Sequence, residues 1–291
     1  MSEPAKPEPL KWFAETLHAA WQQRLKMDRV LFHERTEHQD LIVFENDQWG
    51  TVLALDGVVQ TTTADERAYH EMLAHTPIVA HGRARSVCIV GGGDGGTLRE
   101  VVKHETVRRI VEAELDPEVI QFCKRHLPGL SDGAYDDERL ELRFGDAAHF
   151  MAEEGEKFDV ILVDSTDPIG PGAALFTEAF YRDCRRRLNA GGILATQCGV
   201  PAVQPFELRQ TQQRQKAAGF ADVSFYLTCV PTYVGGYMAL GWASDDPTRR
   251  RIRVDTLASR PIPSGLRHYT PDTHVAAFAH PPWMVDIVDG R

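Results

Sequence analysis

Residues 86–102 read SVCIVGGGDGGTLREVV, and the fold prediction begins from this segment. An apolar strand over 86–90 runs directly into a glycine-rich loop over 91–96, and Leu98, Val101 and Val102 then begin a helix. Such a loop lets a ligand approach the backbone, and the helix N-terminus offers free N–H groups. Turns of this kind occur in dehydrogenases, nucleotide binders and methyltransferase-like folds, so the loop alone indicates a ligand site without choosing the ligand.

The chain after Tyr69 alternates strand-like apolar runs with helical stripes. This alternation predicts an α/β fold, with a parallel sheet covered by helices on both faces. Asp116, followed by Pro117, and Thr177 carry the signals of helix N-termini. The expected strands are 86–90, 109–113, 140–144, 158–163 and 193–196.

The chain before Tyr69 has a different pattern. Runs rich in β-branched and aromatic residues at 30–33, 41–44 and 51–55 are separated by turn residues such as Asp56-Gly57, which predicts a small antiparallel β unit. The first ten residues contain three prolines and predict a mobile tail. We therefore expect a tail over 1–10, an N-terminal β domain over 11–68 and a Rossmann-like domain over 69–291.

Composition excludes several classes of function. The chain has 42 acidic and 32 basic residues and a formal net charge of −10, which disfavours nucleic-acid backbones and favours a cationic ligand. No apolar run is long enough to span a bilayer and the start lacks the apolar core of a signal peptide, so we expect a cytoplasmic protein. Five scattered cysteines without a C-x-x-C spacing predict reduced thiols.

Four carboxylates follow four successive predicted strands. They are Asp94, Glu114, Asp146 and Asp164. The carboxyl ends of strands in an open α/β sheet form the edge where ligands bind, so these acids are expected to share one crevice. Glu114 follows Asp94 by twenty residues, the spacing at which an acid reaches the two hydroxyls of a ribose. The alternative for each acid is that it caps the following helix.

The position of Asp94 restricts the ligand further. A carboxylate inside the glycine loop would repel the pyrophosphate of a nicotinamide cofactor, and it would also repel the carboxylate of S-adenosylmethionine. A donor that lacks this carboxylate would instead present a primary ammonium to Asp94. Asp164 and Asp167 can aim two carboxylates at one amine, and Tyr69 and Tyr233 offer aromatic walls for alkylammonium groups.

A metal site is not expected from the histidines of this region. His70 and His75 lie five residues apart, so they do not share a helix face as the two histidines of a zinc protease helix do.

Five motifs together resemble the spermidine synthases, the bacterial polyamine aminopropyltransferases. They are LDGVVQ at 55–60, YHEM at 69–72, GGGDGG at 91–96, DSTDPIGP at 164–171 and PTY at 231–233. The resemblance extends from about Trp12 to Ala279. It implies a small N-terminal β domain on a methyltransferase-type Rossmann-like catalytic domain, assembled as a homodimer or homotetramer.

The resemblance also implies a reaction and its residues. An aminopropyl group would pass from decarboxylated S-adenosylmethionine to putrescine, giving spermidine and 5′-methylthioadenosine, with Asp164 as the proton acceptor and no metal or permanently bound cofactor. The implied polyamine side comprises Gln60, Tyr69, His70, Asp94, Asp164, Ser165, Thr166, Asp167, Gln197 and Tyr233. The implied nucleoside side comprises Gln39, Gly91, Gly93, Asp94, Glu114, Asp146, Ala147 and Pro171.

The sequence departs from the family pattern at four positions that bear on a lid over the site: Thr63, Ala64, Arg67 and Ala173. Two other functions stay open at this stage. One is a small-molecule methyltransferase that uses intact S-adenosylmethionine, against which Asp94 argues. The other is a catalytically silent protein that binds polyamines or nucleosides. The acceptor amine, whether putrescine, cadaverine or a longer polyamine, is left open by the sequence.

Overall fold

The structure is a computed structural model that describes residues 11–35, 40–168 and 170–291. These residues form two compact units, one ending at Asp65 and the other beginning at Glu66. The tail expected over 1–10 lies outside the described residues.

The N-terminal unit is the antiparallel β unit that the sequence predicts. A four-stranded sheet runs in the order β3-β4-β5-β6, and β1 pairs with β2. Asp56 and Gly57, between β5 and β6, both have positive φ angles of 49° and 80°, as a two-residue hairpin turn requires. The strands are β1 Trp12–Ala14, β2 Arg24–Lys26, β3 Arg29–Arg35, β4 Asp40–Asn46, β5 Gly50–Leu55 and β6 Val58–Thr62.

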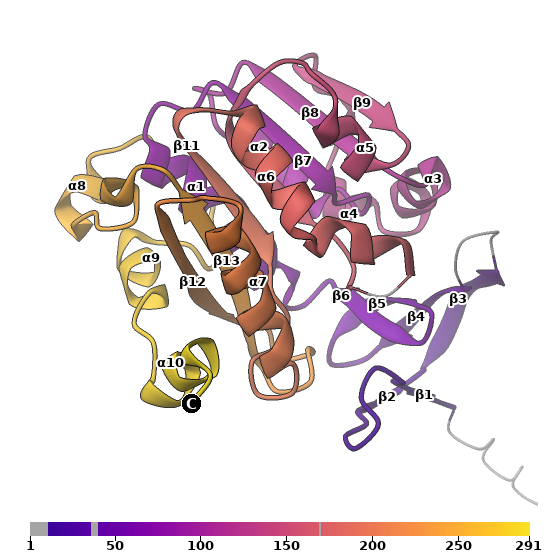
Figure 1. Cartoon of the computed structure of the whole chain (residues 1–291). Helices are drawn as coiled ribbons and strands as arrows, with labels where there is room; N and C mark the ends of the chain where they lie inside the picture. Colours follow the sequence, from indigo (N-terminus) through magenta and orange to yellow (C-terminus); the bar gives the residue numbers. More distant parts are fainter. Residues whose placement is uncertain (1–10, 36–39, 169) are drawn as a thin grey trace, which may run out of the picture. The chain divides into compact units, whose positions relative to one another are not determined.

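The C-terminal unit is built on a seven-stranded sheet in the order β12-β13-β11-β10-β7-β8-β9 (Figure 1). The five strands from β11 to β9 are parallel, as predicted, and β13 and β12 extend the sheet with antiparallel pairing. The sheet is therefore mixed rather than parallel throughout. Its strands are β7 Ser86–Gly91, β8 Arg109–Glu114, β9 Leu140–Phe144, β10 Phe158–Asp164, β11 Leu188–Gln197, β12 Asp222–Cys229 and β13 Tyr237–Ser244.

Strand β11 begins earlier than its predicted start at Ile193. Leu188 already pairs with Phe158, and the register then shifts before Val160 pairs with Ile193. Asn189-Ala190-Gly191-Gly192 therefore forms an irregular stretch of the strand. The preceding helix ends at Arg187.

Two apolar clusters cover the two faces of the sheet, because successive side chains of a strand point to opposite faces. Val160 and Leu162 of β10 join the cluster that contains α1, and Ile161 and Val163 join the cluster that contains α6. The predicted covering of both faces is thus confirmed. The helices are α1 Glu66–His81, α2 Gly96–Val102, α3 Pro117–His126, α4 Pro128–Ser131, α5 Ala147–Ala152, α6 Glu178–Arg187, α7 Pro205–Ala217, α8 Val254–Ala258, α9 Pro271–Ala277 and α10 Pro282–Asp289.

The predicted helix starts at Asp116 and Thr177 are confirmed. The Asp116 side chain accepts a hydrogen bond of 2.8 Å from the Glu118 N–H, and Thr177 Oγ1 accepts one of 3.2 Å from the Phe180 N–H. Within the described ranges, no helix combines the length and the apolar character needed to cross a membrane.

Candidate functional site

Asp164 ends β10, next to the glycine loop that follows β7. The Tyr69 hydroxyl donates a hydrogen bond of 2.8 Å to its Oδ1 atom, and Thr97 Oγ1 donates one of 2.6 Å to its Oδ2 atom. Withdrawal from water raises the pKa of Asp164, and the nearby charge of Asp94 raises it further, whereas His70 and the two hydroxyls oppose the shift. The result is an oriented carboxylate that is more basic than an exposed one.

Asp94 lies in the glycine loop and faces His70. Its Oδ1 atom accepts a hydrogen bond of 2.8 Å from the Gly96 N–H, and its Oδ2 atom lies 3.4 Å from His70 Nε2. His70 Nδ1 lies 2.7 Å from Glu66 Oε2, so carboxylates flank both ring nitrogens. Burial opposes a charge on His70, but Asp94 and Glu66 outweigh it and raise its pKa well above the usual value.

His70, Asp94 and Asp164 also have the composition of a small metal site, since their donor atoms lie within 4.8 Å of one another. The two carboxylates facing the ring nitrogens favour a different state of His70. A protonated imidazole donates from both nitrogens and has no lone pair for a metal. We therefore interpret His70 as a cation that partly neutralises the carboxylates around it.

Glu66 links this centre to two arginines. Its Oε2 atom lies 2.7 Å from Arg99 Nη2, and its Oε1 atom lies 3.0 Å from Arg67 Nε. Although burial opposes ionisation, the His70 and Arg99 partners lower the pKa of Glu66 to about 2. Arg67, one of the departures from the family pattern, is thus held in an ion pair within the C-terminal unit, and it also reaches Glu100 at 3.4 Å.

Two glycines of the loop are required by the side chains packed against them. A Cβ atom on Gly96 would lie 2.2 Å from the His70 ring, and a Cβ atom on Gly91, whose φ is +78°, would lie 2.3 Å from the Asp164 carbonyl oxygen. The loop therefore makes room for residues of the site itself as well as for a ligand.

The other two strand-end acids lie on the far side of the glycine loop. Glu114 ends β8, and its Oε1 atom accepts a hydrogen bond of 3.0 Å from the Asp116 N–H. Burial raises the pKa of Glu114, although backbone N–H groups oppose the shift. Asp146 is exposed at the start of α5 and accepts a hydrogen bond of 2.8 Å from the Ala148 N–H, and the neighbouring Ala147 is buried.

Among the four strand-end acids, the capping alternative is correct for Asp146, whereas the N-caps of α2 and α3 are Gly95 and Asp116. Asp146 is the N-cap of α5, and Asp94 and Glu114 each bind a nearby backbone N–H through one carboxylate oxygen. Asp164 differs, because its carboxylate accepts hydrogen bonds from two side-chain hydroxyls, those of Tyr69 and Thr97. This distinction makes Asp164 the acid whose environment is built entirely by tertiary structure.

The loop after β10 leads to a second group of polar residues. The Gln197 side chain donates a hydrogen bond of 3.2 Å to the Thr166 carbonyl oxygen, and Ser165 Oγ is buried without a hydrogen-bond partner among the described residues. The Tyr233 ring meets Tyr69 edge-on, with 6.1 Å between the ring centres. Tyr69, Tyr233 and the Asp164–Asp167 segment therefore belong to one neighbourhood.

Sequence reasoning missed two residues of this group. Gln204 Nε2 donates hydrogen bonds of 3.0 Å to Asp167 Oδ1 and of 3.1 Å to Glu207 Oε1, so one amide joins two carboxyl groups. Burial, and next the charge of Asp167, raise the pKa of Glu207 to about 7. Its Oε2 atom has no partner among the described residues. Nothing in the sequence around Glu207 signals this role.

Thr97 and Glu66 were also missed, although Thr97 directly follows the glycine loop and could have been noticed there. Three expected residues are not placed with the others. Gln39 and the side chain of Pro171 lie outside the described residues. Gln60 belongs to β6 of the N-terminal unit, where its side chain donates a hydrogen bond of 3.2 Å to the Val58 carbonyl oxygen.

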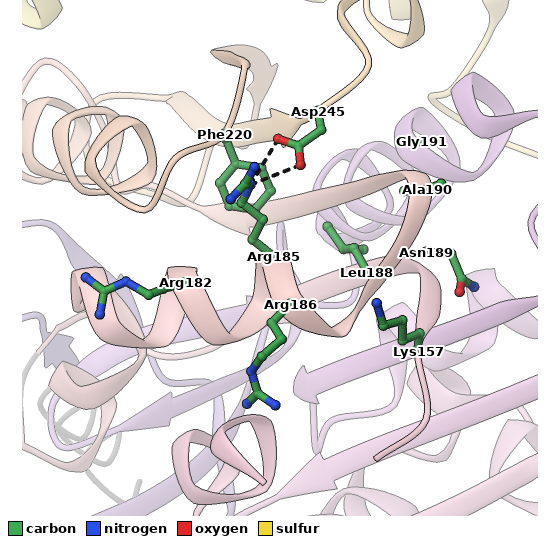
Figure 2. Close-up of a pocket in the computed structure, with 11 residues that line it drawn as sticks. Lys157, Arg182, Arg185, Arg186, Leu188, Asn189, Ala190, Gly191, Phe220 and Asp245 are labelled. Atoms are coloured by element: carbon green, nitrogen blue, oxygen red, sulfur yellow. Dashed lines mark hydrogen bonds and ion pairs between the residues drawn. The ribbon is translucent and has the colours of Figure 1, made fainter. Parts of the chain in front are cut away.

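A surface hollow of about 510 Å³ lies at the opposite edge of the sheet, where β10 and β11 begin (Figure 2). Its three arginines already have partners. Figure 2 shows Arg185 directed toward Asp245, with Nε–Oδ distances of 3.1 and 3.0 Å. Arg186 donates a hydrogen bond of 2.7 Å to the Ala152 carbonyl oxygen, and Arg182 pairs with Glu178. The carboxylate cluster therefore remains the candidate functional site.

Comparison with known proteins gives consistent results over nearly the whole chain. The family model described as "Spermine/spermidine synthase domain" matches residues 66–252, and the one described as "Spermidine synthase tetramerisation domain" matches residues 11–63. A polyamine aminopropyltransferase 1 of Pseudomonas aeruginosa is 51% identical, over 95% of this chain and 97% of that protein. A polyamine aminopropyltransferase of Pectobacterium carotovorum is 50% identical, over 94% and 96%.

Solved structures show the same likeness. A spermidine synthase crystallised in complex with the transition state analogue AdoDATO has a TM-score of 0.91 and 32% identity, covering 100% of this chain and 99% of that chain. The spermidine synthase of Thermotoga maritima has a TM-score of 0.88 and 31% identity, covering 99% and 98%.

Proposed function

Because the chain belongs to the spermine/spermidine synthase family and is a polyamine aminopropyltransferase, we propose that it transfers the aminopropyl group of decarboxylated S-adenosylmethionine to putrescine, with Asp164 as proton acceptor. The observation that carries the proposal is the Asp164 carboxylate, which two hydroxyls orient beside Asp94. The products would be spermidine and 5′-methylthioadenosine.

The donor has chemistry that suits the glycine loop. Decarboxylated S-adenosylmethionine carries a sulfonium and a primary ammonium, and Asp94 would bind this ammonium through a charge-assisted hydrogen bond. Glu114 would bind the ribose hydroxyls, with Gly91, Gly93, Asp146 and Ala147 along the nucleoside. The complex of the AdoDATO-bound relative supports a donor of this class. Intact S-adenosylmethionine would bring a carboxylate toward Asp94, which disfavours the methyltransferase alternative.

The acceptor would lie along the loop that follows β10. Asp164 and Asp167 supply negative charge for the amines of putrescine, and Tyr69 and Tyr233 supply aromatic surface. His70, Ser165, Thr166 and Gln197 complete this side in our proposal.

The reaction requires one proton transfer and one displacement. A protonated amine cannot attack, so Asp164 accepts a proton from the reacting ammonium and exposes a lone pair. The amine nitrogen then bonds to the carbon next to the sulfonium, the carbon–sulfur bond breaks, and its electron pair stays on sulfur. Holding both reactants in line provides much of the acceleration. The neutral thioether has lost the sulfonium charge that the acidic site attracts, which favours release.

The decisive experiment replaces Asp164 by Asn. Turnover is expected to fall by about 10²–10⁴, the usual contribution of a general base, while methylthioadenosine binding measured by calorimetry stays nearly unchanged. Asp255→Asn, at an exposed surface site, is the matched control. The wild type is also incubated with decarboxylated or intact S-adenosylmethionine and with each of several diamines. The masses of the products then identify the donor and the acceptor. An unchanged rate in Asp164→Asn would remove Asp164 from its proposed role.

We also propose that the chain acts as a homodimer or homotetramer, with residues 11–68 as an association domain and residues 69–291 as the catalytic domain. The match of residues 11–63 to a model named for tetramerisation supports this proposal. Sedimentation velocity of the full chain would show a single monomeric species if the proposal is wrong.

A further inference from the structure

Glu112 is a completely buried carboxyl group in the middle of β8, beneath the glycine loop. On its own face of the sheet lie Ile110 and the Tyr135 ring, both in the apolar cluster that contains α1. The Oε1 atom of Glu112 lies 3.1 Å from the Tyr135 hydroxyl, and its Oε2 atom has no hydrogen-bond partner among the described residues. An ionised carboxylate with one neutral partner is costly in such a place.

The Tyr135 hydroxyl contacts two oxygens but carries only one proton. It lies 3.0 Å from the Gly93 carbonyl oxygen as well as 3.1 Å from Glu112 Oε1. A carbonyl oxygen can only accept, so an ionised Glu112 would leave one of these contacts without a proton. If Glu112 is protonated, it donates to Tyr135, and Tyr135 donates to Gly93. Both contacts are then hydrogen bonds.

We propose that Glu112 is kept as a neutral carboxylic acid and that, through Tyr135, it positions the glycine loop that carries Asp94. Neither residue contacts the reacting groups in this proposal, so both are positioning residues. The functional part rests on the proposed binding of the donor ammonium by Asp94.

The charges around Glu112 favour the neutral form. The groups that act on it are Glu114 on the same strand, Asp94 in the glycine loop, Asp164 on β10 and Tyr135, and Cys88 lies on the neighbouring β7. None of these is a cation. Lys124 Nζ lies 5.4 Å from the centre of the Tyr135 ring, and Glu112 itself forms no ion pair within the described part of the chain. Burial, and next the charge of Glu114, raise the pKa of Glu112 well above its usual value.

Tyr135 holds the loop by packing as well as by its hydroxyl. A Cβ atom on Gly95 would lie 2.8 Å from the Tyr135 ring, so the ring is in close contact with the loop immediately after Asp94. Immediately before Asp94, the Gly93 carbonyl oxygen contacts the Tyr135 hydroxyl. Tyr135 therefore contacts the loop on both sides of Asp94, at Gly93 and at Gly95.

The protonation state is tested by stability, independently of activity. An acid whose pKa is higher in the folded state loses stability as the pH rises above its unfolded value of about 4.3. Glu112→Gln removes this loss and keeps a donor toward Tyr135. The melting temperature of Glu112→Gln relative to the wild type should therefore rise between pH 5 and pH 8, by about 3 °C or more. A relative melting temperature that falls or stays flat over this range would overturn the neutral assignment.

An infrared difference spectrum gives a second measurement of the same state. The wild type at pH 7 should show the carbonyl stretch of a protonated carboxyl group that Glu112→Gln lacks. Its absence would contradict the proposal.

The positioning role is tested by kinetics of the full chain. Tyr135→Phe and Glu112→Leu should each raise the KM for decarboxylated S-adenosylmethionine about three- to tenfold, which corresponds to one lost hydrogen bond, with a smaller effect on the diamine. Glu112→Gln, which keeps a donor toward Tyr135, should have a nearly normal KM for decarboxylated S-adenosylmethionine. The double variant should lose no more than either single variant, because both break the same chain of hydrogen bonds.

Tyr181→Phe is the matched control, because Tyr181 also has a fully buried hydroxyl but belongs to the cluster on the other face of the sheet. Its donor KM should not change. Equal KM effects in Tyr181→Phe and Tyr135→Phe, or a normal KM in Tyr135→Phe, would overturn the positioning role. The two proposals can fail separately. An unchanged rate in Asp164→Asn, with a melting temperature of Glu112→Gln that still rises with pH relative to the wild type, would contradict the proposed reaction alone. A reduced rate in Asp164→Asn with a flat relative melting temperature of Glu112→Gln would contradict the neutral Glu112 alone.

Discussion

The Tyr69 hydroxyl donates a hydrogen bond of 2.8 Å to Asp164 Oδ1, across 95 residues of sequence. Tyr69 lies in the first turns of α1, and Asp164 ends the strand β10 that α1 contacts. This hydrogen bond stabilises the ionised carboxylate, so it opposes the rise in the pKa of Asp164 that burial causes. The balance between these two effects determines the pH at which the proposed proton acceptor, Asp164, becomes ionised.

Tyr69→Phe is expected to raise the pKa of Asp164, because one donor to the carboxylate is lost. The ionised acceptor would then form at higher pH, so the acidic limb of the kcat profile should move upward by about one pH unit. Tyr226→Phe is the control, since its buried hydroxyl donates to the Met72 carbonyl oxygen instead. If the acidic limb does not move in Tyr69→Phe, this hydrogen bond does not tune the acceptor.

Asp94→Asn is expected to discriminate between two nucleosides. Affinity for decarboxylated S-adenosylmethionine should fall about 10- to 100-fold, because a charge-assisted hydrogen bond to its ammonium is lost. Methylthioadenosine has no ammonium and should lose much less, and Asn can still accept from the Gly96 N–H. Calorimetric titration with each ligand makes the comparison. Equal losses for both would refute the assignment of Asp94.

Glu207→Gln is expected to change how acceptor binding depends on pH. With its pKa near 7, Glu207 gains negative charge as the pH rises through neutrality, and the charge should attract the distal ammonium of a diamine. The KM for putrescine should therefore fall from pH 6 to pH 8 in the wild type and change less in the variant. Glu118→Gln, at an exposed first-turn position of α3, is the control. Parallel profiles for Glu207→Gln and wild type would exclude Glu207 from acceptor binding.

Gly96→Ala is expected to destabilise the fold and reduce activity. The new Cβ atom would lie 2.2 Å from the His70 ring, which cannot move freely because Glu66 and Asp94 flank it. The free energy of unfolding should fall by about 1–3 kcal/mol, as in other overpacked sites. Gly129→Ala, where a Cβ meets nothing within 4 Å, should leave it unchanged or raise it. Chemical denaturation measures both, and a Gly96→Ala variant as stable as Gly129→Ala would contradict this interpretation.

Local sequence patterns predicted the elements whose geometry is local. Asp116-Pro117 and Thr177 begin helices because their side chains bind N–H groups only two or three residues away. Asp56-Gly57 forms a hairpin turn because both residues tolerate a positive φ. Pairing across the sheet determines the antiparallel strands β12 and β13 and the early start of β11. No short sequence pattern predicted them.

The order of the residues places acids directly after successive parallel strands. Parallel strands end at the same edge of a sheet, so Asp94 and Asp164 were expected together. The surroundings of these acids depend instead on long-range packing. Contacts between segments distant in the chain give Asp164 its partners Thr97 and Tyr69, pair Glu66 with Arg99 and bury Glu112 against Tyr135. The Gln204 link between Asp167 and Glu207 is another such contact. Their hydrogen bonds and desolvation arise from packing, and packing sets the charge state on which the chemistry of this site depends.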